Sequence, residues 1–433
     1  MKKKLLAALL SAIVVMGSTA GCGQKGTQSG GGSTGASAGG NGKTIKIGLM
    51  VPLTGTGVQA GQEVKALAEI FADIINNDHP DLNLPFAKGE GLPNLGGAKV
   101  EFVTGDLSSP DIAMSEAERL ITQQNVIGLC GNFASASTKT AMVPAEKYHR
   151  IVLSEGTSNT LTQAGYQYYG RAFPGDNDFV KDTFDYLDQL NKTKNAGIKT
   201  VALVSEDSEF GTYIAGLERT EIPKHGFKQV EDIYYSASAT NVTSEVLRLK
   251  NANPDVVIMS SYAADALLFM STYKEMNYFP KMLFGQRGGF MTSDFLKNLG
   301  SDSDYVMTTA RWNTDINNEA SKTVAKLFYD KMGFPLSGDV LNSAWDGVLL
   351  AAIANQAGST DADAMRKVMS EGIKIDKAED PFALEGYKFD ESGQNVYGKA
   401  IILQYMNKSL KTIYPQAAST AEAAYPAKGW NER

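Results

Sequence analysis

The chain has 433 residues, of which 43% are hydrophobic, and a formal net charge of −7 at pH 7. This length allows two domains, each with a substantial core. The acidic balance and the lack of any basic stripe in the body of the chain argue against nucleic acid as a partner.

The first residues predict an export signal. Met1–Lys4 carry positive charge, Leu5–Met16 form an apolar stretch too short to cross a membrane, and Gly17–Gly21 are mostly small. The region ends at Cys22, and its Ala-Gly-Cys ending resembles the bacterial lipobox, in which the cysteine is lipidated and becomes the new N-terminus. A plain signal peptide with an incidental cysteine is the alternative. We predict a lipoprotein signal peptide at 1–21 and lipid attachment at Cys22.

The segment 22–42 is rich in Gly, Ser, Ala and Thr and cannot bury apolar area, so we expect a flexible tether. Signal, cysteine and tether together predict a protein that is exported and lipid-anchored on the outer face of the cytoplasmic membrane, at the cell surface or in the periplasm. If Cys22 is acylated, Cys130 has no partner for a disulfide. Its apolar neighbours predict a buried position at the end of a strand.

The chain that follows the tether alternates strands and helices. An apolar run from Ile45 to Val51 leads into a Gly-rich loop, 52–61, and then a helical pattern over 64–75. Further strands and helices follow at intervals of about 25 residues, which is typical of a parallel, doubly wound sheet. The expected strands are Lys99–Val103, Val126–Cys130 and Arg150–Ser154, and the expected helices are Ala113–Gln123 and Ser135–Tyr148.

A second series with the same rhythm begins after Phe173–Asp176, where we expect the chain to cross to another lobe. A second crossover is expected at Gly285–Gly289. Between them we expect strands at Thr200–Val204, Gln229–Tyr235 and Asp255–Met259, and helices at Phe179–Leu190, Phe210–Thr220, Val242–Lys250 and Ala263–Tyr273. Beyond them we expect a strand at Asp304–Thr309, helices at Asn318–Met332 and Asn342–Gln356, and a final strand at Ala400–Met406.

These patterns predict an α/β protein with two doubly wound parallel-sheet lobes, joined by several chain crossings around a cleft that can close. We assign 43–171 and 286–393 to lobe 1, 172–285 and 394–415 to lobe 2, and 416–433 to a C-terminal tail.

The glycine spacing Gly55-x-Gly57-x-x-x-Gly61 lies between a strand and a helix and invites a dinucleotide-binding interpretation. The spacing is one residue longer than the usual fingerprint, and the acid at the end of the second strand, Asp106, lies more than 40 residues beyond Gly61. Hydrolase motifs are absent, and the three histidines are isolated in sequence. We therefore expect no enzyme activity, no cofactor and no metal site.

Polar residues follow the strands on both sides of the expected cleft. Ser135, Thr157 and Ser158 could form a carboxylate cradle together with the N–H groups of helix starts. Simple N-capping is the alternative for each residue alone. Across the cleft, Asp265 follows a strand and could pair with an ammonium group. Its alternative is an acid that stabilises the start of a helix.

With these residues in view, the chain resembles the branched-chain amino-acid binding proteins of ABC transporters, the Leu/Ile/Val-binding family, from about Lys43 to about Tyr405. The resemblance implies the type I periplasmic binding-protein fold, with three crossovers forming a hinge. It is carried by IKIGLMVPLTGTGVQAG, GDLSSPDIAMSEAERLI, Ser135 with Thr138–Glu146, SEGTSNTLTQAG and AWDGVLLAAIA.

The resemblance also implies roles for single residues. Ser135, Thr157 and Ser158 would hold a ligand α-carboxylate, Phe210 would pack over the ligand, and Asp265 would receive the ammonium. Family members often have Tyr at the Phe210 position, Glu at the Asp265 position and an aromatic residue where this chain has Ala60, which puts the side-chain preference in doubt. The expected ligand-binding residues are Gln59, Ala60, Phe133, Ala134, Ser135, Glu155, Gly156, Thr157, Ser158, Phe210, Tyr262, Asp265 and Arg287.

The function implied is capture of a small amino acid, branched-chain or otherwise apolar, and its delivery to the permease and ATPase subunits of an importer. We expect a monomer attached to the membrane through lipid on Cys22. One alternative is a sensing receptor module of the same fold. Another is a binding protein for an amide, urea-type or aromatic small molecule.

Overall fold

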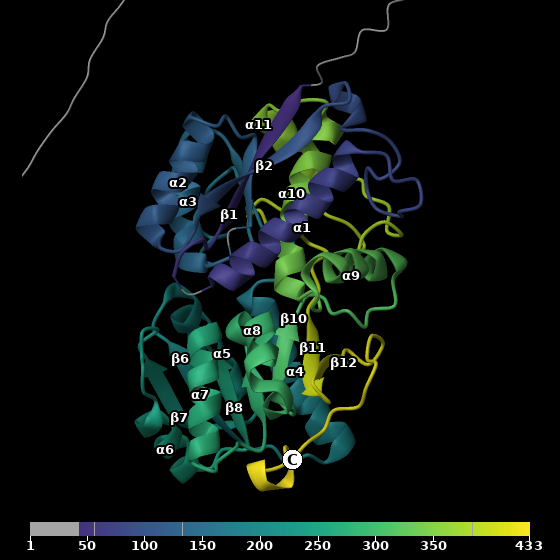
Figure 1. Cartoon of the computed structure of the whole chain (residues 1–433). Coiled ribbons are helices and arrows are strands. Elements are labelled where there is room, and N and C mark those ends of the chain that lie inside the picture. The colour runs from purple at the N-terminus through teal and green to yellow at the C-terminus, as the bar shows by residue number, and fades with distance from the viewer. Residues whose placement is uncertain (1–42, 56, 132, 383) are drawn as a thin grey trace, which may run out of the picture. The chain divides into compact units, whose positions relative to one another are not determined.

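The computed structural model describes residues 43–433 except 56, 132 and 383 (Figure 1). The predicted signal peptide, Cys22 and the tether lie outside these residues. Two β-sheets organise the described chain: one has five strands and the other has seven. We call the five-stranded sheet and its helices lobe 1, and the seven-stranded sheet and its helices lobe 2.

The sheet of lobe 1 is parallel and has the strand order β2-β1-β3-β4-β5. β1 lies between β2 and β3, and its last five residues are all buried, which explains why its sequence is almost continuously apolar. The strands are β1 (Thr44–Val51), β2 (Lys99–Asp106), β3 (Gly128–Gly131), β4 (Ile151–Leu153) and β5 (Tyr169–Gly170).

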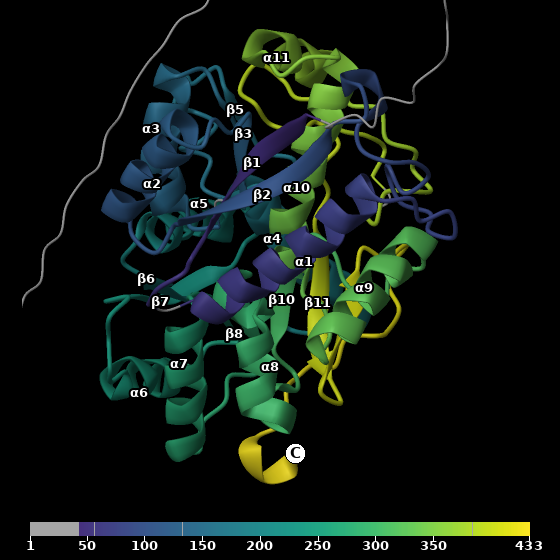
Figure 2. The same ribbon diagram turned by 45° about the horizontal axis from the view of Figure 1, so that its top comes forward.

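Helices cover both faces of this sheet. One face packs against the apolar sides of α1 and α10, which lie side by side in Figures 1 and 2, and the other packs against α2 and α3. Trp345 of α10 is fully buried and meets Phe71 of α1 edge to face. The helices of lobe 1 are α1 (Val58–Asn76), α2 (Pro110–Thr122), α3 (Ser135–Lys147), α9 (Glu319–Met332), α10 (Gly338–Ala357) and α11 (Ala362–Glu371), with a short 3-10 turn, η1 (Pro93–Leu95).

The sheet of lobe 2 has the order β12-β11-β10-β9-β8-β6-β7. Its strands from β6 to β10 are parallel, whereas β11 and β12 run antiparallel to their neighbours. The strands are β6 (Thr200–Glu206), β7 (Lys228–Tyr235), β8 (Val256–Ser260), β9 (Leu283–Gly285), β10 (Met307–Ala310), β11 (Ile401–Met406) and β12 (Ser409–Tyr414).

The helices of lobe 2 also lie on both faces of their sheet. α4 and α5 supply apolar residues to one core cluster, and α6, α7 and α8 supply them to the other. They are α4 (Asp176–Lys194), α5 (Glu209–Lys224), α6 (Thr243–Ala252), α7 (Ala263–Glu275) and α8 (Ser293–Leu299), with the 3-10 turns η2 (Gly288–Met291), η3 (Gly300–Ser303) and η4 (Trp430–Glu432).

The chain passes between the lobes three times. The first passage, after β5, lies where the sequence predicts it. The second was predicted at Gly285–Gly289, and this prediction is wrong, because β10 still pairs with β9 and β11 in lobe 2. The chain leaves lobe 2 only after Ala310, and Trp312 is already part of the lobe 1 core. The third passage lies between Gly393, whose carbonyl accepts from Arg171 N–H, and β11.

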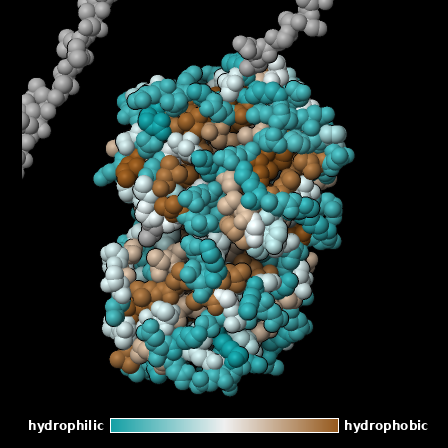
Figure 3. All heavy atoms as spheres, in the orientation of Figure 1, coloured by the Kyte–Doolittle hydropathy of each residue, from teal (hydrophilic) through white to brown (hydrophobic). Residues whose placement is uncertain are grey.

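The described residues from Lys43 onward belong to one compact unit. The predicted limits of the two lobes therefore stay predictions, except that β10 belongs to the sheet of lobe 2. The C-terminal residues fold back on lobe 2: Trp430 donates to the carbonyl of Tyr278 at 2.8 Å, and the Arg433 guanidinium lies 4.0 Å from the ring centre of Phe279. Figure 3 shows apolar patches separated by hydrophilic residues on the face in view. Among the described helices, none combines the length and the apolar character needed to span a bilayer.

Candidate functional site

A cavity of about 500 Å³ lies between the lobes. Every segment that lines it comes after the carboxyl end of a strand of a parallel sheet, which is where ligands bind in folds of this type. Lobe 1 contributes Pro52, Gly55, Gly57, Val58, Gln59, Ala60, Leu107, Ser108, Phe133, Ala134 and Ala136, and lobe 2 contributes Ser208, Tyr262, Ala263, Ala264, Leu267, Gly288, Gly289, Thr292 and Asp294.

Five helices of the described chain begin at this cavity: α1, α3, α5, α7 and α8. The N-cap residues of α1, α3 and α7 are Gly57, Ala134 and Tyr262, and among the described residues none of the three makes a side-chain capping bond. By contrast, Ser208 caps α5 and Thr292 caps α8 at the same cavity, so the uncapped starts are those of α1, α3 and α7. Uncapped helix starts present free N–H groups and the positive end of the helix dipole, so this cavity favours an anionic group.

Aromatic and aliphatic side chains form much of the remaining wall. The rings of Phe133 and Tyr262 face each other from the two lobes with their centres 6.2 Å apart, and Phe210 packs behind Tyr262 at 5.6 Å. Leu107 and Leu267 complete this apolar part. A ligand with an apolar body and an acidic group fits such a lining.

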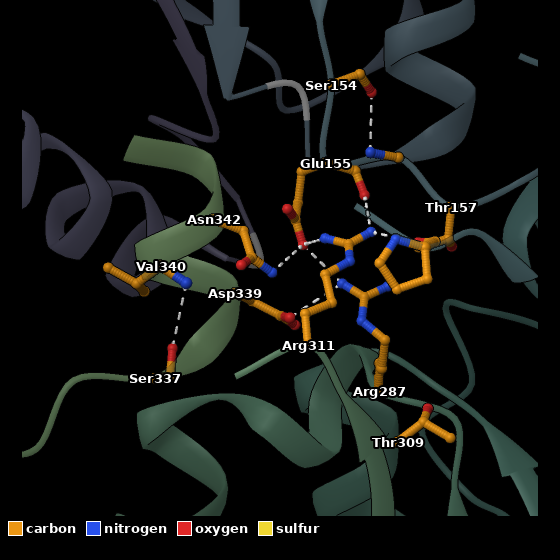
Figure 4. Close-up of polar contacts among 12 residues, drawn as sticks. Ser154, Glu155, Thr157, Arg287, Thr309, Arg311, Ser337, Asp339, Val340 and Asn342 are labelled. Atoms are coloured by element: carbon orange, nitrogen blue, oxygen red, sulfur yellow. Dashed lines mark hydrogen bonds and ion pairs between the residues drawn. The ribbon is translucent and has the colours of Figure 1, made fainter. Parts of the chain in front are cut away.

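Beside the cavity, a buried ion cluster joins the lobes (Figure 4). Arg287 of lobe 2 donates to Glu155 at 2.7 Å and to Asp339 at 3.0 Å, both in lobe 1. Arg311 also pairs with Glu155 and donates to its backbone carbonyl at 3.1 Å, while Asn342 donates to the Glu155 carboxylate at 3.4 Å. These side chains are almost wholly excluded from solvent, so they hold the two lobes together through contacts that water does not screen.

Burial perturbs the titration of this cluster. Burial raises the pKa of Glu155 to about 7, although the guanidiniums of Arg311 and Arg287 act in the opposite direction. Burial likewise lowers the pKa of Arg311 to about 10. Both guanidiniums also lie over the ring of Phe179, at 5.0 and 5.6 Å, which partly replaces their lost hydration.

Arg287 has a backbone conformation that is unusual for a residue with a side chain, with φ 51° and ψ −128°. Such conformations persist where the surroundings fix them, and they gather at functional sites. Gln286, the preceding residue, is held by Glu218 and Thr183, which its side-chain amide reaches at 3.0 and 3.2 Å. The strained residue is thus anchored on one side, and the two glycines that follow it line the cavity.

The structure brings several predicted site residues together without exposing them to the cavity. Ser158 N–H donates to the Ser135 hydroxyl at 3.3 Å, and both residues are buried. Arg171 donates to the carbonyls of Thr157 at 2.6 Å and Ser158 at 3.1 Å. The N–H of Gly156 donates to Ser154 at 2.9 Å. Of the thirteen predicted residues, the lining of the cavity includes Gln59, Ala60, Phe133, Ala134 and Tyr262.

Asp265 lies after β8, in the first turn of α7, but within the described chain it is not among the residues that line the cavity. Its carboxylate accepts a short hydrogen bond from the Tyr235 hydroxyl, which also contacts Ser261 at 2.6 Å. Burial raises the pKa of Asp265 to about 6. Among the described residues of α7, Ala263, Ala264 and Leu267 line the cavity and Asp265 does not. Asp265 is an acid in the first turn of α7, and its pairing with a ligand ammonium stays a prediction.

Several residues at the site escaped the sequence analysis. Arg311 and Asp339 lie in the ion cluster, and Glu63, Asp294 and Ser343 line a smaller hollow that adjoins the cavity. Glu63 gave a usable signal, because it is a charged residue one turn after Ala60 on a helix face that is otherwise apolar. Arg311 gave only its place after the expected strand Asp304–Thr309, and Asp339 gave none, since their meeting with Glu155 and Arg287 depends on how distant segments pack.

A two-lobed α/β protein with a lined cavity between its sheets is, by fold and site, a ligand-binding protein of the hinged type. The chain belongs to the periplasmic binding protein family, whose model matches residues 44–407. Members of this family act outside the cytoplasm as solute-binding proteins.

The chain is 28% identical over 392 residues to the Leu/Ile/Val-binding protein homolog 7 of Brucella melitensis, with 88% of this chain and 94% of the relative covered. Among solved structures, it is similar to the branched-chain amino acid transporter substrate-binding protein LivJ of Streptococcus pneumoniae, solved with isoleucine. The TM-score is 0.71, the identity is 20%, and 86% of this chain and 100% of the other are covered.

A solute-binding protein of an ABC transporter from R. palustris, solved with benzoate, also has a TM-score of 0.71, at 18% identity, with 89% of this chain and 99% of the other covered. These structures show that the chain has the type I periplasmic binding-protein fold, as predicted.

Proposed function

We propose that the protein is the extracytoplasmic solute-binding component of an ABC importer and that it captures a small amino acid, branched-chain or otherwise apolar, in the cavity between its lobes. The observation that carries the proposal is the cavity itself, which combines three uncapped helix starts with an apolar wall. The helix starts suit a ligand carboxylate, and the wall suits an aliphatic or aromatic side chain. The isoleucine bound by the S. pneumoniae neighbour has the same two parts.

Capture works by closure in this proposal. The ligand binds to lobe 1 through the segments after β1 and β3, and lobe 2 then brings Tyr262 and the start of α7 onto it. Arg287 of lobe 2 pairs with Glu155 and Asp339 of lobe 1, so in this proposal these pairs stabilise the closed form. A ligand shifts the balance between open and closed forms by its difference in affinity for the two.

Ala60 sets the room available near the first helix start. It lies in the first turn of α1 and lines the cavity, and an alanine at this point leaves space for a ligand larger than the branched-chain amino acids. Seven predicted residues lie behind the lining and would act by holding the loops that form it. They are Ser135, Glu155, Gly156, Thr157, Ser158, Phe210 and Arg287.

We further propose that the protein is a lipid-anchored monomer that docks on a permease with its ATPase. The export signal, Cys22 and the tether support this arrangement. Labelling with a radioactive fatty acid should mark the native protein and spare the Cys22→Ala variant. A native protein that takes up no label, or a Cys22→Ala variant labelled as strongly as the native protein, would contradict it.

A second candidate is a binding protein for an aromatic carboxylic acid. The facing rings of Phe133 and Tyr262 favour it, and the R. palustris neighbour binds benzoate. The ligands of both candidate functions carry an acidic group, and only the amino acid carries an amino group as well.

A thermal-shift screen with all common amino acids, benzoate-type acids and simple amides tests the proposal. A specific ligand at 100 times its dissociation constant should add about 2.7 kcal/mol to the free energy of unfolding. A screen in which no small molecule raises the melting temperature would overturn the proposed function. A response confined to benzoate-type acids would favour the second candidate.

A further inference from the structure

A small hollow of about 40 Å³ adjoins the cavity and extends it between α1, α8 and α10. The two spaces share Gln59, Ala60, Phe133 and Thr292 among their lining residues. A space of this size holds a water molecule or a group such as an ammonium, but it cannot hold a whole amino acid. We call it the inner chamber.

Carboxylates from both lobes line the inner chamber. They are Glu63 of α1, Asp294 of α8 and Asp339 of α10. The facing cations are Arg287, which binds Asp339 at 3.0 Å, and the more distant Lys297, which acts on Glu63 through its charge. Burial raises the pKa of Glu63, whose carboxylate accepts from Gln59 at 3.0 Å and from Ser293. The chamber therefore has more acidic than basic groups around it.

Two polar atoms of the chamber wall have no hydrogen-bond partner among the described residues. They are Oδ2 of Asp339 and Oγ of Ser343, and both side chains are more than nine-tenths buried. Buried polar atoms in proteins nearly always have a hydrogen-bond partner. Two unpartnered atoms in one chamber therefore indicate that a ligand group binds there. A carboxylate oxygen can only accept, so the missing group must be a hydrogen-bond donor.

A protonated amine matches these requirements better than a metal ion. An ammonium has three donors and a positive charge. In the described part of the chain, His, Cys, Asp and Glu form no group of three or more that could hold a metal ion. The uncapped starts of α1 and α7 line both spaces, whereas the starts of α8 and α10 at the chamber are capped by Thr292 and Ser337. Three carboxylates line the chamber and one lines the larger cavity, so the chamber is the better place for a cation.

We infer that the inner chamber binds the protonated amino group of the ligand, with Asp339 Oδ2 and Ser343 Oγ as its direct partners and Glu63 supplying further negative charge. The inference rests on the proposed function and deepens it: the ligand is an amine-bearing carboxylate whose ammonium enters the chamber while its carboxylate meets the helix starts. Asp265 takes no part in this recognition.

Matched ligand pairs test the inference. Leucine is compared with 4-methylpentanoate, and phenylalanine with 3-phenylpropanoate, by titration calorimetry on the full mature protein. Each acid keeps the carboxylate and the side chain and lacks only the amine. The wild-type protein should bind at least one of the two amino acids ten times or more tightly than its partner acid.

Three variants locate the amine. Asp339→Asn should weaken binding of that amino acid at least tenfold and leave the partner acid within threefold. Ser343→Ala should weaken it about threefold; because its hydroxyl has no partner, this variant reports on the chamber even if loss of the Arg287 pair impairs folding of Asp339→Asn. Asp330→Asn, on the exposed side of α9, is the matched control and should change neither affinity.

Asp265→Asn separates the inference from the proposed function. If Asp265→Asn weakens binding of the amino acid tenfold while Asp339→Asn and Ser343→Ala do not, the amine lies elsewhere, so the inference fails and the function stands. If the partner acids bind as tightly as the amino acids, the inference fails and the aromatic or aliphatic acid candidate gains. If none of the four compounds and no other compound of the thermal-shift screen binds, both the inference and the proposed function fail.

Discussion

Replacing Glu218 with glutamine should stabilise the protein increasingly as the pH rises. Glu218 lies on α5 and is fully excluded from solvent. One of its carboxylate oxygens accepts from Gln286 at 3.0 Å, and the other has no hydrogen-bond partner among the described residues. Burial raises the pKa of Glu218 from its ordinary 4.5 to about 8. The folded protein therefore keeps a proton here that the unfolded chain releases.

The size of the effect follows from this difference in pKa. Because the folded state binds more protons than the unfolded state above pH 4.5, the free energy of unfolding falls as the pH rises, and the fall levels off above pH 8. Relative to acid conditions, the wild-type loss is about 1 kcal/mol at pH 5, about 2 kcal/mol at pH 6 and about 4 kcal/mol at pH 8. Glutamine resembles the protonated acid and has no such loss, so Glu218→Gln should gain these amounts.

Denaturant unfolding at pH 5, 6, 7 and 8, followed by tryptophan fluorescence, measures the difference. Glu391→Gln is the matched control, since Glu391 is exposed and its exchange should change stability by less than about 0.5 kcal/mol at every pH. A difference between Glu218→Gln and wild type that stays constant from pH 5 to pH 8 would contradict a raised pKa for Glu218 in the folded protein. A variant less stable than wild type at pH 8 would also refute it.

Three further changes test other parts of the structure. Gly61→Ala places a methyl group about 2.0 Å from the Pro52 carbonyl oxygen, so the loop after β1 must move; denaturant unfolding should show a loss of about 2–3 kcal/mol, and an unchanged midpoint would contradict this close approach. Ala60→Tyr fills the cavity from α1 and should weaken binding of the best ligand of the thermal-shift screen at least tenfold, whereas Ala60→Ser should bind normally; equal binding by both variants would place the ligand elsewhere. Tyr387→Phe leaves the Trp345 indole N–H and the Asp380 carboxylate without the hydroxyl that joins them at 3.0 Å each, so unfolding should show a loss of about 2 kcal/mol, and a loss below about 0.5 kcal/mol would mean that water replaces it.

Strong periodic patterns made most of the fold predictable. The apolar positions between Val64 and Ile75 recur at three and four residues and fall within α1, and the run Val201–Val204 lies at the centre of β6. Short elements carried too little pattern: β5 has two residues and α8 has seven. The hairpin of β11 and β12 was missed because its turn residues, Asn407 and Lys408, take positive φ angles without a glycine to announce them.

The misplaced crossover has a physical cause. The glycines from 285 to 289 looked like a flexible connection. In the structure Gly289 instead lets the chain approach the start of α7, because a Cβ there would lie 2.2 Å from the Tyr262 carbonyl oxygen. Glycine was needed for close backbone packing within lobe 2. A single sequence does not separate these two uses of the residue.

The location of the candidate site was predictable from the sequence, whereas the contacts between its side chains were less so. The rule that ligands meet the carboxyl ends of parallel strands placed Gln59, Ala60, Phe133 and Tyr262 at the cavity. Asp265 follows the same rule but turns toward Tyr235, and this depends on β7, which lies two strands from β8 in the sheet. Arg311 and Asp339 belong to segments far from the strand ends of lobe 1, so only the packing of the lobes brings them to Glu155 and Arg287.

The most direct test of the whole account is a crystal structure of the protein grown with the amino acid that gives the largest thermal shift. The account predicts ligand density between Phe133 and Tyr262, with the carboxylate at the first turns of α3 and α7 and the ammonium within hydrogen-bond distance of Asp339 and Ser343. Density at any other place, or an amino acid whose ammonium contacts Asp265, would contradict it.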